Sequence, residues 1–205
     1  ACVLSMQGRN DAAARGFEEA IRLNPSAHMT HHLYGRHAFG VGEMEKAVEL
    51  YRTAIRLEPD DYQSLALLEG PLRSLGRTDE ARESNRLAGL AIERRLQRRP
   101  DDVRALLLGS VQAAHEADAE RARALGDRAM AARPDDFSTA YNVACANALL
   151  GDHDRALELL DRAVRHGRGN LGWIEHDTDF ASLRGDPRFE AIVGRLRAAA
   201  AGTVP

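Results

Sequence analysis

Proline recurs in this sequence at a spacing that constrains the fold more than any other feature. Pro25 and Pro59 are 34 residues apart, and so are Pro100 and Pro134. The 41 residues from Pro59 to Pro100 are the same period with seven residues added. Seven residues make about two turns of an α-helix, so such an insertion lengthens a helix without rotating its apolar face. A period of this length predicts a tandem array of helical repeats.

Two columns of alanine follow the same period, seven residues apart. The first contains Ala13, Ala47, Ala81, Ala122 and Ala156, and the second contains Ala20, Ala54, Ala88, Ala129 and Ala163. A small side chain lets the backbones of two antiparallel helices approach closely where the helices cross. We therefore expect these alanines to be buried at helix crossings.

A third column marks the turn inside each repeat. Gly8, Gly42, Gly76 and Gly151 each lie between two amphipathic stretches, and Ala117 takes that place once. Glycine commonly ends a helix, because it adopts the left-handed conformation that a turn there requires. Each repeat is therefore predicted to be a helix, a short turn, a second helix and a proline-marked turn.

These columns resemble the tetratricopeptide repeat family over roughly residues 1–170. The resemblance rests on the alanines, the turn glycines, Gly35 and the proline turns. It implies an all-α fold, a right-handed α-α superhelix of helical hairpins, closed by a C-terminal helical cap. The expected repeats are 1–27 (incomplete), 28–61, 62–102 with an extended second helix, 103–136 and 137–170, followed by the cap at 171–205.

Some positions depart from the pattern of the family. Its early aromatic in the first helix is replaced by His31, Leu65, Leu106 and Ala140, and its late aromatic in the second helix is replaced by Asn85 and Gly126. Weaker packing is expected at those places. Gly70-Pro71 interrupts a predicted first helix, and proline removes a backbone donor there, so a kink or an early break is expected.

The segment 171–205 breaks the period and is predicted to cap the array. Asp186 before Pro187 has the features of a helix start, and Trp173 is expected to be largely buried. His176, Asp177 and Asp179 are expected to cap short helices in preference to binding a metal. The tail resembles the segment that closes repeat arrays in bacterial signalling proteins, where an adenylate cyclase, kinase or winged-helix domain precedes the repeats. The array is therefore expected to be a regulatory module of a larger bacterial protein.

Composition excludes several classes of protein. With 44% hydrophobic and 29% charged residues, the chain is too apolar to be disordered. No apolar run approaches the roughly 20 residues that span a bilayer, and a net charge of −3 gives no bulk attraction to nucleic acid. We therefore expect a cytoplasmic protein that binds neither membrane nor nucleic acid.

The histidines near the start of the second repeat provide the main metal hypothesis. His28 and His32 are one turn apart on a predicted helix, which suits two metal ligands. A metal site or a metal-dependent enzyme at these histidines is thus one alternative, and self-association of the array is another. The sequence has no GxSxG, Walker or GxGxxG motif. The prediction is a protein without enzymatic activity, catalytic residues or cofactors.

The resemblance also implies a binding surface, because the first helices of such repeats line a concave groove. The matching positions chosen as the partner-binding groove are Met29, His32, Arg36, Phe39, Gln63, Arg73, Arg104, Tyr141 and Cys145. The groove positions contain three arginines and no carboxylate. Such a surface favours a protein or peptide segment that is acidic or carboxylate-ended. The predicted function is a non-catalytic protein-interaction scaffold.

Overall fold

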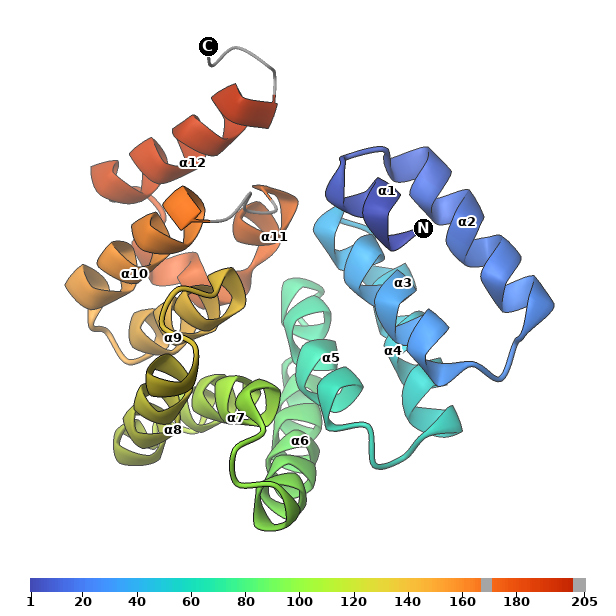
Figure 1. Cartoon of the computed structure of the whole chain (residues 1–205), viewed down its shortest axis with the longest axis horizontal. Coiled ribbons are helices and arrows are strands. Elements are labelled where there is room, and N and C mark those ends of the chain that lie inside the picture. Colours follow the sequence, from blue (N-terminus) through green and yellow to red (C-terminus); the bar gives the residue numbers. More distant parts are fainter. Residues whose placement is uncertain (167–170, 201–205) are drawn as a thin grey trace. The chain divides into compact units, whose positions relative to one another are not determined.

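The computed structural model describes residues 1–166 and 171–200 and consists of helices joined by short turns (Figure 1). These residues contain no strand, which confirms the all-α fold class. Residues 167–170, the end of the predicted fifth repeat, and residues 201–205, the end of the predicted cap, lie outside the described part. None of the described helices has the length and the apolar character that crossing a membrane requires.

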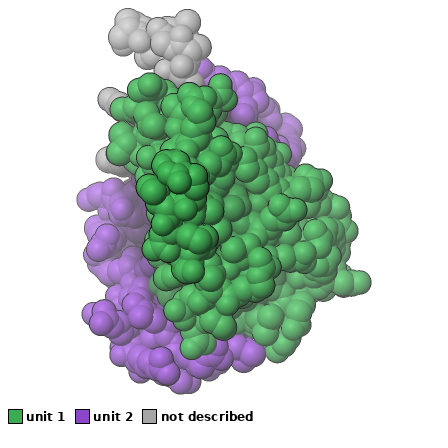
Figure 2. Space-filling view, turned by 90° about the vertical axis from the view of Figure 1, so that its right-hand side faces the viewer, with its two compact units in different colours: residues 1–87 green, residues 88–205 purple. Residues whose placement is uncertain are grey.

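The chain divides into two compact units, residues 1–87 and 88–205 (Figure 2), and passes from one to the other within α6. Unit 1 contains α1 (Cys2–Met6), α2 (Asn10–Leu23), α3 (His28–Gly40), α4 (Met44–Leu57), α5 (Tyr62–Ser74) and the first part of α6 (Thr78–Arg98). Unit 2 contains the rest of α6, α7 (Val103–His115), α8 (Ala119–Ala132), α9 (Phe137–Leu149), α10 (His153–His166), α11 (Leu171–His176), the 3-10 helix η1 (Thr178–Leu183) and α12 (Pro187–Ala200).

Consecutive helices pair as hairpins, and the turn inside each hairpin has the predicted geometry. The closest pairs are α3 with α4, α7 with α8, and α9 with α10 (Figure 1). Gly42 has a φ of 85° and Gly151 a φ of 79°, a left-handed conformation that glycine adopts without steric cost. Ala117 adopts the same conformation with a φ of 59°. The turn between α7 and α8 thus forms despite the lack of glycine.

The alanine columns are buried. Nine of the ten alanines are exposed by 1% or less, and Ala20 is half-buried. This result confirms the expected burial for all but that first-repeat position.

Aspartates begin several of the helices. Asp61, Asp102 and Asp136, each the second acid after a proline turn, accept hydrogen bonds from the backbone N–H groups of Gln63, Ala105 and Thr139. Such caps satisfy donors that have no partner within the helix. The proline turn and the helix start are therefore coded by one short run of residues.

Two helices show how the period is altered. α6 has 21 residues where α4 has 14, a difference of two helical turns. α5 runs unbroken through Pro71, so the expected early break is wrong. The helix ends only three residues later, and the backbone N–H of Leu75 still donates to the carbonyl oxygen of Pro71. Loss of one donor close to a helix end is tolerated.

The C-terminal helices cover apolar surface on α9 and α10. Ile174, Phe180 and Leu183 are fully buried in the core of unit 2, and α12 adds further apolar side chains to it. Trp173 is partly buried beside the ring of Tyr141, and its neighbour Ile174 is fully buried. Asp186 accepts from the backbone N–H of Arg188, as expected of a helix start at Pro187.

Candidate functional site

Most of the predicted binding positions of unit 1 lie on one shared face of α3 and α5. Met29, Arg36 and Phe39 are spaced by seven and three residues, which places them on one side of α3. The Phe39 ring is 3.5 Å from the point where a Cβ on Gly70 would stand, so this side of α3 meets α5. Arg73 follows Gly70 by one turn and shares its side of α5. We call this surface the α3–α5 face.

The α3–α5 face offers both apolar and polar groups to solvent. Met29 is 41% exposed, and Phe39, Arg36, Gln63 and Arg73 are half-buried. Burial lowers the pKa of the Arg36 guanidinium. Half-buried side chains are already partly ordered, so a partner that contacts them immobilises fewer free rotamers.

His32 is a predicted contact that the structure places in the interior. Its Nδ1 is 2.8 Å from Ser64 Oγ, and the Ser64 hydroxyl donates to Asp61 Oδ2 at 2.5 Å. Asp61 is also the residue that caps α5. His32 therefore fixes α3 against the start of α5, and its ring is unavailable to a partner on the surface.

Arg73 is paired with the carboxylate of Glu69, which was not among the predicted groove positions. Its Nε donates to Glu69 Oε1 at 2.5 Å, and Glu69 is buried. The expected surface of three arginines without a carboxylate is thus corrected, because Glu69 balances one of the three charges. The signal was present in the sequence, since acid and base four residues apart face each other on a helix.

The predicted positions of unit 2 are partly interior. Arg104 on α7 is half-buried, whereas Tyr141 and Cys145 on α9 are buried. The Tyr141 hydroxyl donates to Asp177 Oδ2 at 2.6 Å, and Cys145 Sγ is 3.7 Å from the same oxygen. Burial, with the nearby Asp177 carboxylate, raises the pKa of both groups well above their ordinary values. Both side chains are therefore protonated donors inside unit 2.

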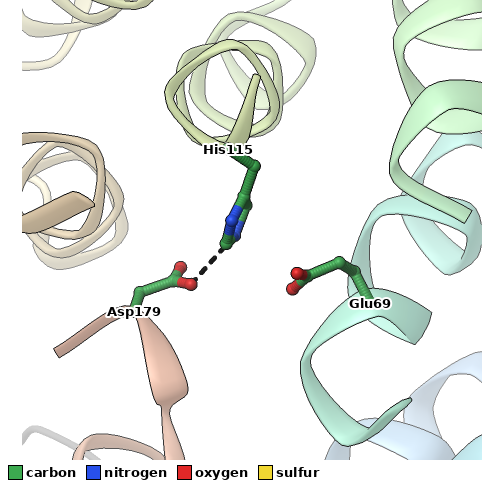
Figure 3. Close-up of side chains that lie close together, drawn as sticks. All are labelled: Glu69, His115 and Asp179. Carbon is green, nitrogen blue, oxygen red and sulfur yellow. Dashed lines mark ion pairs between the residues drawn. The ribbon is translucent and has the colours of Figure 1, made fainter. Parts of the chain in front are cut away.

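A second polar contact ties α7 to η1 in unit 2. His115 Nε2 is 3.0 Å from Asp179 Oδ1, and the two side chains point toward each other in Figure 3. The backbone N–H of Asp179 donates to Asp177 Oδ1 at 3.0 Å, which confirms Asp177 as the cap of η1. Sequence reasoning missed this contact, because His115 precedes its partner by 64 residues and no local spacing connects them.

Possible metal ligands gather in unit 2 away from the predicted histidines. The ligand atoms of Cys145, Asp177 and Asp179 lie within 4.8 Å of one another. The Asp177 carboxylate already accepts hydrogen bonds from Tyr141, Cys145 and the backbone N–H of Asp179. Within the described part of the chain, neither His28 nor His32 joins a group of three such ligand atoms.

The comparisons with known proteins agree with the repeat pattern. Residues 1–69 match the tetratricopeptide repeat family. The matched residues include α1 to α4 and the first half of α5, hence much of the α3–α5 face. A search among curated proteins finds no match to the chain.

Solved structures of similar fold extend beyond the matched repeats. PilW, described as a widely conserved type IV pilus biogenesis factor, is 19% identical with a TM-score of 0.54, and the alignment covers 96% of this chain and 89% of PilW. YrrB, described as a TPR protein with an unusual peptide-binding site, is 19% identical with a TM-score of 0.45 and coverages of 84% and 86%. MamA is 15% identical with a TM-score of 0.48 and coverages of 80% and 94%. The PilW likeness shows the fold of this chain and nothing about its role.

Proposed function

We propose that this chain is a non-catalytic protein-interaction scaffold that binds a peptide or protein segment on the α3–α5 face. The observation that carries the proposal is the combination, on one face, of partly exposed apolar and basic side chains: Met29, Phe39, Arg36 and Arg73. Binding surfaces typically combine apolar anchors with polar groups that fix the register of the partner. The tetratricopeptide match of residues 1–69 supports this use of the face.

The preferred segment in this proposal is acidic or carboxylate-ended. A carboxylate meeting Arg36 gains a charge-assisted hydrogen bond. Arg73 contributes less net attraction, because Glu69 already shares its charge. Each partly exposed charge contact contributes about 0.5–1 kcal/mol, so apolar contact with Phe39 and Met29 supplies the larger part of the affinity. The resemblance of the tail supports a regulatory role within a larger bacterial protein.

The test selects binders from a random peptide library displayed on phage against the whole chain. The affinity of the selected peptides is then measured for two variants, Phe39→Ala on the face and Leu57→Ala elsewhere. Leu57 on α4 is 38% exposed, so it is a matched apolar control. We expect peptides rich in Asp and Glu whose affinity falls at least about tenfold in Phe39→Ala, as anchor residues do, and is unchanged in Leu57→Ala.

The affinity of the selected peptides is also measured at low and at high salt, and it should fall as the salt concentration rises. Exposed charge contacts weaken as ionic strength rises, because the screening length falls from about 10 Å at 0.1 M to about 3 Å at 1 M. Peptides that bind Phe39→Ala as tightly as the unaltered chain would contradict the proposal. Selected peptides without acidic residues would contradict its charge preference alone.

A further inference from the structure

Unit 2 contains a pocket between α8 and α9 with a volume of about 330 Å³. Its lining includes Ser110, Arg123, Gly126, Met130, Val143 and Ala146. Val143 and Ala146 are largely buried and form an apolar wall, whereas Arg123 is exposed at the rim. The pocket therefore has one apolar wall, and its exposed rim carries both basic and acidic side chains, because Asp127, Asp152 and Arg155 line it as well.

The pocket lies where another repeat holds an aromatic ring. In unit 1 the ring of Tyr51, on α4, packs against Gly35, on α3, and a Cβ on Gly35 would stand 2.9 Å from that ring. In the repeat register, Gly126 takes the place of Tyr51 and Ser110 takes the place of Gly35. The interior of unit 2 thus lacks one ring at this position.

The side chains around the pocket suit an aromatic occupant. The thioether of Met130 makes favourable contacts with an aromatic ring, and the Arg123 guanidinium can lie over the ring face. The Ser110 hydroxyl donates to the Ala122 carbonyl at 2.7 Å, so this polar group is satisfied without a ligand. The volume falls at the lower end of the range of about 300–1,000 Å³ that is usual for ligand pockets.

We propose that this pocket binds one aromatic side chain of a partner protein. The array then takes from its partner the ring that its own repeat lacks. The site shares no residue with the α3–α5 face, so it goes beyond the function proposed above. A negative result at one site therefore does not decide the proposal for the other site.

Methionine methyl groups provide the readout. The chain has four methionines, and Met130 lines the pocket, whereas Met6, Met29 and Met44 belong to unit 1. With ¹³C-methyl-labelled methionine, N-acetyl-tyrosinamide is titrated to millimolar concentration as a probe of a tyrosine within a peptide. N-acetyl-leucinamide tests for unspecific apolar binding, and free tyrosine tests for a small-molecule ligand. We expect a saturable shift of the Met130 signal with the tyrosinamide alone.

Two variants connect the signal to the pocket. The double variant Ser110→Gly with Gly126→Tyr rebuilds the pair found at Gly35 and Tyr51, and should abolish the Met130 response by filling the pocket. Arg123→Ala changes only an exposed side chain and leaves the interior intact. It should weaken binding about two- to fivefold, the size expected for a cation–π contact. Arg121→Ala, on the same helix outside the pocket, is its matched control.

Each remaining outcome overturns the proposal. Shifts of similar size at all four methionines, or none at Met130, would show that the pocket does not take a ring. An equal response to the leucine probe would remove the preference for aromatic groups. An equal response to free tyrosine would make the ligand a small molecule instead of a partner segment. A response that survives in both the double variant and Arg123→Ala would place the binding elsewhere.

Discussion

The contact between α4 and α5 in unit 1 and that between α8 and α9 in unit 2 join neighbouring hairpins in different ways. α4 packs closely on α5, whereas α8 makes fewer contacts with α9. Tyr51 is nearly fully buried at the first junction, and Gly126 leaves a pocket at the second. The alanines of the hairpins, Ala54 and Ala129, are fully buried in both. The Tyr51 ring contacts Gly35 inside its own hairpin and also clusters with Leu68 and Leu72 of α5, so this column of the repeat contributes both within a hairpin and between hairpins.

The largest expected effect comes from removing the ring that closes the first junction. Tyr51→Ala should lower the free energy of unfolding by about 3–5 kcal/mol, as for other buried aromatic truncations. Tyr51→Phe keeps the ring and serves as the control. Urea unfolding followed by circular dichroism measures both variants. A loss below about 1 kcal/mol in Tyr51→Ala, less than usual for a buried large side chain, would mean that the two junctions do not differ in packing.

A smaller effect should follow from changing the residue opposite the ring. Gly35→Ala places a methyl group 2.9 Å from the Tyr51 ring. Overpacking of this kind costs about 1–3 kcal/mol. Ser110→Ala, at the same repeat position of unit 2, removes only the hydrogen bond to the Ala122 carbonyl, which contributes about 1 kcal/mol. The loss of unfolding free energy is measured for Gly35→Ala and Ser110→Ala by urea titration. Equal losses in the two variants would contradict the difference between the two junctions.

The smallest expected effect concerns the turns inside the hairpins. The α3–α4 turn has a glycine where the α7–α8 turn has an alanine. Ala117 has the left-handed conformation that Gly42 adopts in unit 1. Ala117→Gly should raise the free energy of unfolding by about 0.5–1 kcal/mol, because relief of the Cβ strain exceeds the entropy cost of glycine. Gly42→Ala should have the opposite sign. Thermal melts of the two variants test this, and a shift of the same sign in both would contradict it.

Local signals in the sequence predicted much of the fold. The buried alanines, the left-handed glycine turns and the helix start at Pro187 all depend on residues close together in the chain. In the tail, Trp173 and its neighbour Ile174 are both apolar, and only tertiary packing decides that Ile174 is the more deeply buried of the two. An early break at Pro71 was one of the two expected effects, and α5 instead continues through this residue to Ser74.

The candidate sites were less predictable than the fold. Assigning Tyr141 and Cys145 to a surface followed the repeat register, and no local pattern shows that Asp177 lies against them. The pairing of Arg73 with Glu69 could have been inferred from their spacing. Gly126 stands where the repeat family has an aromatic residue, which indicates weaker packing at this place. The size of the pocket, however, depends on how closely α8 and α9 approach.

The side chain of Ser110 has a consequence for how this pocket could be gained or lost by mutation. A Cβ at Gly126 would stand 3.2 Å from Ser110 Oγ, so a large ring introduced there meets the serine first. Gly126→Tyr alone should therefore be poorly tolerated, and it becomes favourable only after Ser110→Gly. The order of the two mutations matters, and the two effects will not be additive. Closing the pocket with a ring from the chain itself should therefore take two mutations, one at Ser110 and one at Gly126.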